Sequence, residues 1–126
     1  MSHITTPAFE VRARRHDHCV ELRLAGELDL LQAPLVQQAV DQFMTETGLP
    51  VLLVDVTRLT FCDSSGIHVF VRAHQRAQRE HRQVILAGAG GHLERVLAVL
   101  HLDAYLDLRR SPQEVLDHLV RSGSTR

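Results

Sequence analysis

Short apolar runs alternate along this chain with longer segments in which apolar residues recur every three or four positions. The runs at residues 51–54 and 84–86 have apolar side chains at successive positions, which is typical of strands covered by helices on both faces. Parallel strands need a crossover connection of a dozen or more residues between them. The alternation therefore predicts an α/β fold whose sheet is mostly parallel.

The first part of the chain has a different pattern, since apolar and polar residues alternate one by one over residues 9–14 and 20–24. That alternation indicates two half-buried strands, and the polar residues 15–18 between them are typical of a turn, so we expect an antiparallel hairpin. A further edge strand is expected at residues 105–108. The predicted sheet is thus mixed and mostly parallel, with four to five strands, an N-terminal hairpin and about four covering helices.

Four segments have helical periodicity, and their expected starts and ends rest on local signals. Asp29 is predicted to cap the first helix, and residues 55–62 are expected to be a short connector before the second. The second helix is expected to end at about Glu80. His74 lies on its apolar face, where we expect a half-buried imidazole with a hydrogen-bond partner. The last helix is predicted to begin at the capping box of residues 111–114.

The length of 126 residues is that of one ordinary domain. We expect residues 1–126 to form a single domain, with its core over about residues 9–120 and flexible tails at 1–7 and 122–126. The formal net charge of -1 argues against a protein that binds nucleic acid through its overall field. No apolar run is long enough to span a membrane, no export signal is found, and two scattered cysteines suit a reducing compartment, so the expected location is cytoplasmic.

The segment at residues 60–67, TFCDSSGI, follows an apolar strand and opens the second helix. Ligand and regulatory sites of open α/β sheets tend to lie at such strand ends. The hydroxyl of Ser64 has two interpretations: it caps the helix, which the local sequence favours, or it is exposed and accepts a phosphate. A phosphate would carry a charge of about -1.5 to -2 beside Asp63, and beside Asp29 if the first helix starts at the same edge.

Three segments together resemble the STAS domain family, and more narrowly the small bacterial anti-sigma factor antagonists. They are GELD at residues 26–29, VLLVD at residues 51–55 and FCDSSGI at residues 61–67. The resemblance covers residues 9–120, and the element order agrees with the one expected from periodicity. DSSG alone is a weak match, but its position after a buried strand makes the combination fairly specific.

The resemblance implies a partner-switching protein and not an enzyme. In such systems the unphosphorylated antagonist binds an anti-sigma factor that is also a serine kinase, which releases a sigma factor for transcription. The kinase uses ATP to phosphorylate the first serine of the DSSG box, here Ser64, and a PP2C-type phosphatase removes the phosphate. The resemblance implies no catalytic residue and no cofactor, since ATP arrives with the kinase. Neither direct nucleic-acid binding nor membrane binding is expected.

The resemblance also implies a docking surface around the acceptor serine, shaped by Asp29, Asp63, Ser65 and Gly66. His68 differs from the small residue that relatives often have there. It is expected on the solvent side of the helix start, where it bears on which kinase docks. Arg72 belongs to a stripe with Arg76 and Arg79. Such a stripe is usually solvated, and its alternative role is to dock against an acidic patch of the kinase.

Other interpretations stay open. Within the family the alternative is a STAS module of another role, such as nucleotide or lipid-pathway sensing, without phospho-switching. Hydrolase chemistry has little support, because Ser64 lacks a G-x-S-x-G elbow and no histidine is placed by spacing as its base. His16, His18 and Cys19 are candidate metal ligands, but no second ligand pair has standard spacing, so no metal site is expected. The loop at residues 88–91, GAGG, could cradle a phosphate, although such loops are more often flexible.

Overall fold

The structure, a computed structural model, describes residues 3–5 and 8–124. These residues form an α/β domain in which strands and helices alternate as the sequence predicts. In chain order the elements are β1 (His3–Thr5), β2 (Phe9–Arg15), β3 (Cys19–Leu28), α1 (Ala33–Glu46), β4 (Val51–Cys62), α2 (Ser64–Arg79), β5 (Gln83–Ala87), α3 (Gly91–Val99), β6 (Asp107–Arg109) and α4 (Pro112–Ser124).

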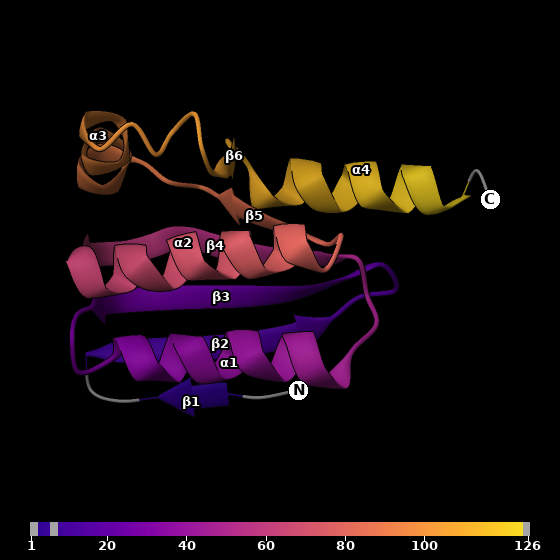
Figure 1. Ribbon diagram of the computed structural model, residues 1–126, viewed down its shortest axis with the longest axis horizontal. Coiled ribbons are helices and arrows are strands. Elements are labelled where there is room, and N and C mark those ends of the chain that lie inside the picture. The colour runs from indigo at the N-terminus through magenta and orange to yellow at the C-terminus, as the bar shows by residue number, and fades with distance from the viewer. Residues whose placement is uncertain (1–2, 6–7, 125–126) are drawn as a thin grey trace.

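The strands form one sheet in which each strand pairs with its neighbours along the chain (Figure 1). β1, β2 and β3 are antiparallel, whereas β3, β4, β5 and β6 are parallel. The N-terminal hairpin and the mixed, mostly parallel sheet are therefore confirmed. The described residues contain six strands and not four to five, because β1 adds an edge strand too short to show an alternating pattern.

The two ends of the chain differ from the prediction in detail. Residues 3–5 pair with β2, so this part of the first expected tail is a strand. Residues 122–124 belong to the end of α4. The other tail residues, 1–2, 6–7 and 125–126, lie outside the described residues. The edge strand expected at residues 105–108 is present as β6, which begins two residues later.

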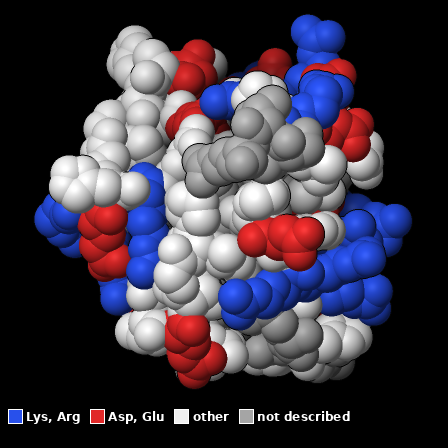
Figure 2. All heavy atoms as spheres, turned by 90° about the vertical axis from the view of Figure 1, so that its right-hand side faces the viewer, with Lys and Arg blue, Asp and Glu red and all other residues white. Residues whose placement is uncertain are grey.

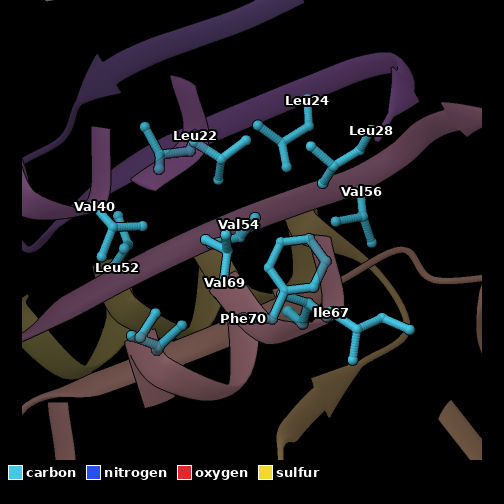
Figure 3. Close-up of a cluster of buried hydrophobic side chains, with 14 of the residues drawn as sticks. Leu22, Leu24, Leu28, Val40, Leu52, Val54, Val56, Ile67, Val69 and Phe70 are labelled. Carbon is cyan, nitrogen blue, oxygen red and sulfur yellow. The ribbon is translucent and has the colours of Figure 1, made fainter. Parts of the chain in front are cut away.

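The larger of two hydrophobic cores lies on the sheet face that α1, α2 and α3 cover. Side chains of the two central strands, β3 and β4, meet these helices there. Among these buried strand residues, Figure 3 labels Leu22 and Leu24 of β3 and Leu52 and Val54 of β4. This core fixes the starts of α1 and α2 against the ends of the central strands.

The smaller core lies on the opposite face of the sheet, where α4 packs. Its buried members include Cys19, Leu53, Ile85 and Val115. Because α4 is the one described helix on this face, it leaves much of β2 and part of β3 without a covering helix.

β4 is longer than predicted, because residues 55–62 continue the strand and do not form a connector. Its pairing with β3 shifts register twice, first between Arg23 and Ala25 and again between Gly26 and Glu27, and at each shift β4 contains one extra residue. Such bulges interrupt the regular alternation of side chains. The second half of β4 therefore has no strand-like pattern in the sequence.

α1 begins later than predicted, and Asp29 is not its N-cap. The cap residue is Gln32, whose side chain makes no capping hydrogen bond. Asp29 Oδ1 instead accepts hydrogen bonds from the backbone N–H groups of Leu31 (3.1 Å) and Gln32 (3.0 Å), which holds a turn between β3 and the helix. Pro34 lies in the first helical turn, where a missing N–H costs nothing.

His74 is half-buried on α2, as the sequence predicts, but its expected hydrogen-bond partner is absent among the described residues. Nε2 is buried without a partner. The ring packs edge-on against Tyr105, with ring centroids 4.8 Å apart. An aromatic ring offers no strong acceptor, so this part of the prediction is wrong.

Candidate functional site

Ser64 is the first residue of α2 and follows Asp63, the N-cap. Asp63 Oδ1 accepts hydrogen bonds from the backbone N–H groups of Ser65 (2.9 Å) and Gly66 (3.4 Å). The capping interpretation of Ser64 is therefore wrong, because its neighbour performs that role. The side chain of Ser64 is exposed, and within the described part of the chain its hydroxyl has no hydrogen-bond partner.

Gly66 is buried where the first turn of α2 passes over the ends of β3 and β4. A Cβ atom at this position would lie 2.7 Å from Cys62 Sγ and 2.8 Å from two side-chain carbons of Leu28. Only a glycine lets the helix approach so closely. The structure thus gives Gly66 a packing role beneath the surface that Ser64 occupies.

The acidic residues Asp29 and Asp63 follow adjacent strand ends. β3 and β4 are parallel and end at the paired residues Leu28 and Cys62. The N–H group of Asp63 donates to the carbonyl oxygen of Leu28 at 3.1 Å, which ties the two ends together. Asp29 and Asp63 therefore lie at the same edge of the sheet, which is the condition under which a phosphate on Ser64 would also lie near Asp29.

A shallow groove of about 380 Å³ lies between the starts of α1 and α2, and we call it the docking groove. Its lining includes Leu30, Pro34, Gln37, Ser65, His68 and Arg72. Three of the residues predicted to bind a partner, Ser65, His68 and Arg72, are therefore brought together. His68 is exposed, as predicted.

Exposed apolar side chains flank this groove, and the sequence reasoning missed them. Leu30, which lines the groove, is 71% exposed, and the adjacent residue Leu31 is 79% exposed. Large exposed apolar side chains that lie together mark interaction sites. The available signal was the pair Leu30-Leu31 directly after Asp29, in a segment that follows the strand and precedes the helical periodicity.

The three arginines of the stripe on α2 have different surroundings. Arg76 is held within the molecule, by Asp41 of α1 at 3.0 Å and by Glu80 at 3.1 Å. Arg72 and Arg79 are exposed and have no ion-pair partner among the described residues. Of the three, Arg72 is the one that borders the docking groove.

The other candidate sites gain little from the structure. His16 Nε2 lies 3.1 Å from Glu21 Oε1, and no group of three or more potential metal ligands occurs among the described residues. The loop at residues 88–91 borders a hollow of about 280 Å³, where a Cβ at Gly88 would collide with the side chain of Thr57. Within the described part of the chain, no helix is both long and apolar enough to cross a membrane.

Burial also sets the chemistry of the thiol next to the site. It raises the pKa of Cys62 from 9.0 to about 12, and the charge of Asp63 adds to this effect. The thiolate is the reactive form of cysteine. Cys62 is therefore an unreactive packing residue beneath the helix start.

Comparison with known proteins identifies the fold. The model of the STAS domain family matches residues 10–115. The chain belongs to the STAS domain family. The matched residues include both strand ends, the DSSG box and the docking groove.

Similar proteins are antagonists of anti-sigma factors. The STAS domain is 28% identical over 108 residues to the anti-sigma-B factor antagonists of Listeria monocytogenes and Listeria innocua, covering 86% of this chain and 93% of each relative. Its fold is similar to that of an anti-sigma factor antagonist from Mycobacterium paratuberculosis, with a TM-score of 0.79, 20% identity and coverage of 91% of this chain and 97% of the other.

The fold also matches a protein solved in two phosphorylation states. The unphosphorylated form of the anti-sigma factor antagonist SpoIIAA gives a TM-score of 0.75, with 18% identity over 86% of this STAS domain and 95% of that chain. Phosphorylated SpoIIAA, from Bacillus, gives a TM-score of 0.71, with 18% identity over 86% of this domain and 98% of that chain.

Proposed function

We propose that this STAS domain is an anti-sigma factor antagonist whose binding is switched off by phosphorylation of Ser64. The observation that carries the proposal is the exposed Ser64 hydroxyl, which is free of any capping role because Asp63 holds the helix start. The names of the relatives support it, since they are antagonists of the same kind. One of them, SpoIIAA, exists in a phosphorylated form.

The partner in this proposal is an anti-sigma factor that is also a serine kinase. Ser64 Oγ attacks the γ-phosphorus of ATP held by the kinase, the bond to the bridging oxygen breaks, and ADP leaves. The hydroxyl proton passes to a base on the kinase. A PP2C-type phosphatase reverses the modification by hydrolysis. The chain supplies the acceptor and needs no catalytic residue or cofactor of its own.

The position of Asp63 explains why the phosphate would act as a switch. A helix N-terminus ordinarily stabilises a phosphate through its free N–H groups. Here the N–H groups of Ser65 and Gly66 already donate to Asp63. The phosphate would therefore remain at the surface beside a carboxylate, with a charge of about -1.5 to -2.

The docking groove explains why the charge of a phosphate on Ser64 would prevent a partner from binding. A partner that covers Leu30 and Leu31 must remove water from the neighbouring surface, including Ser64. Removing water from a neutral hydroxyl costs little free energy, whereas removing it from an unpaired phosphate dianion costs a great deal. Binding is thus expected to fail once Ser64 is phosphorylated, without any change of fold.

Phosphorylation by the anti-sigma kinases of the same genome tests the site. The wild-type chain and Ser65→Ala should each gain one phosphate, mapped to Ser64, while Ser64→Ala gains none. Phosphate on Ser65, or on neither serine with any of these kinases, would refute the assignment. A STAS module of another role would give the second result.

Binding of the unphosphorylated chain to the kinase tests the groove. We expect Leu30→Ala, a change in the lining of the groove, to weaken binding by about tenfold, since about 1.4 kcal/mol of apolar contact is lost. Val120→Ala is the matched control, because Val120 is also exposed, at 65%, but lies on α4. Equal affinities of the two variants would show that the partner does not cover this groove.

A further inference from the structure

A polar hollow lies on the sheet face where α4 packs, at strands that this helix leaves uncovered. It has a volume of about 340 Å³ and runs between the start of α4 and strands β2, β3 and β4. We call it the arginine hollow. Its lining includes Arg12, Arg23, Arg58, Asp55, Thr57 and Ser111.

The strand register places two of these arginines directly opposite each other. Arg12 of β2 and Arg23 of β3 are direct cross-strand partners. Like charges in directly opposed positions destabilise a sheet. Their side chains are about half exposed, at 52% and 51%, so both remain accessible. Figure 2, which looks on to the end of the molecule near the β2–β3 turn, shows arginine side chains gathered along its right-hand side.

A buried carboxylate fixes one of the pair. Glu21 is only 1% exposed, and its two oxygens accept from His16 Nε2 at 3.1 Å and from Arg23 Nε at 3.2 Å. A buried carboxylate is tolerated when it is paired in this way. The contact uses one of the several N–H donors of Arg23, and it holds the guanidinium at the hollow.

The remaining carboxylates of the hollow are also engaged. Glu10 Oε2 lies 2.8 Å from His3 Nε2 and a more distant 3.9 Å from Arg12. Asp55 Oδ1 accepts from the N–H group of Thr57 at 3.0 Å. Arg58 has no ion-pair partner among the described residues. The three carboxylates that line the hollow, Glu10, Glu21 and Asp55, thus already have partners, and within the described part of the chain Arg58 is left without one.

We propose that the arginine hollow binds a small anion that carries a phosphate or carboxylate group. Such a group would lie between Arg12 and Arg23, relieve their repulsion and accept from Arg58. Planar guanidinium groups match the oxygens of both anions. Thr57 and Ser111 border the same space. Ser64 does not line it, so this proposal is independent of the phosphorylation switch.

Titration of the full, isotope-labelled chain by NMR tests the proposal, with inorganic phosphate and citrate as separate probes and sodium chloride at equal ionic strength as the control. We expect saturable shifts at Thr57 and at the start of α4 with at least one probe. A response to phosphate alone identifies a phosphate group as the ligand's anion, and a response to citrate alone identifies carboxylates. Shifts that never saturate, or that chloride reproduces, would show an adventitious ion only and overturn the proposal.

Variants separate this binding from structural effects. Arg12→Gln and Arg58→Gln should each lower the affinity for the responding probe by about tenfold or more. Arg79→Gln on α2 should leave that affinity unchanged. Arg12→Gln should not lower the urea midpoint, because it removes a like-charge pair. Unchanged affinity in both hollow variants would overturn the proposal, and each variant serves as the test if the other fails to fold.

Discussion

At the residue scale, Gly66 shows how tightly the helix start is packed. Gly66→Ala places a Cβ within 2.8 Å of Leu28 side-chain carbons and 2.7 Å from Cys62 Sγ, so these two buried side chains must move. We expect the free energy of unfolding to fall by about 1–3 kcal/mol, measured by urea denaturation. Gly48→Ala is the control, because a Cβ there meets nothing within 4 Å. Equal stabilities would contradict the close approach.

The two thiols give a prediction with a defined pH dependence. Burial raises the pKa of Cys19 from 9.0 to about 11 and that of Cys62 to about 12. Between these pH values the folded state keeps thiol protons that the unfolded state releases. The contribution of the two buried thiols to the free energy of unfolding is therefore fully present below pH 9 and is lost as the pH rises towards 11 and 12.

Alkylation by iodoacetamide at pH 8 measures this protection. Because only thiolate reacts, we expect both cysteines to label at least roughly a hundredfold more slowly in the folded chain than in urea. The rate in the folded state should rise as pH increases from 8 to 10. Fast labelling of the folded chain at pH 8 would show that the thiols are accessible and ordinary.

At the element scale, the start of α2 depends on one side chain. Asp63→Ala removes the acceptor of two backbone N–H groups, and we expect a loss of about 1 kcal/mol in unfolding free energy. Ser64→Ala should change it by less than about 0.5 kcal/mol, since the hydroxyl has no partner among the described residues. Denaturation of both variants checks the assignment, and a larger loss for Ser64→Ala would reverse it.

Arg82 joins the ends of two helices. Its Nη1 and Nη2 groups donate to the carbonyl oxygens of Phe43 (3.4 Å) and Met44 (3.2 Å), near the end of α1. Its guanidinium carbon lies 5.3 Å from the centroid of the Phe43 ring. We expect Arg82→Met to lower the thermal midpoint through a loss of about 1–2 kcal/mol. Arg79→Met is the matched control. An equal fall of the thermal midpoint in both variants would show that the contacts of Arg82 with α1 do not stabilise the fold.

The order of elements was predictable from sequence, but several boundaries were not. The strand signals at residues 51–54 and 84–86 are strong because both faces are buried. The second half of β4 was missed because two bulges disturb its alternation. The start of α2 was located correctly, yet aspartate and serine are both good caps, so the sequence could not assign the cap to Asp63 over Ser64.

At the scale of the whole molecule, the switch is predicted to leave the fold intact. Ser64→Asp adds charge at an exposed helix start, where the helix dipole favours it and Asp63 opposes it. We therefore expect the far-UV circular dichroism to stay unchanged and the unfolding free energy to change by less than about 0.5 kcal/mol, while kinase binding is lost. Loss of cooperative unfolding would show that the charge acts through the fold.

Local signals in the sequence were sufficient for the α/β order, the hairpin, the family and the candidate acceptor Ser64, because periodicity and short motifs are properties of neighbouring residues. Which distant side chains meet became known from the folded molecule. Folding paired Arg76 with Asp41, exposed Leu30 beside the docking groove, and placed Arg12 opposite Arg23. These relations depend on strand register and helix packing, which bring together residues far apart in the chain, and no local pattern records them.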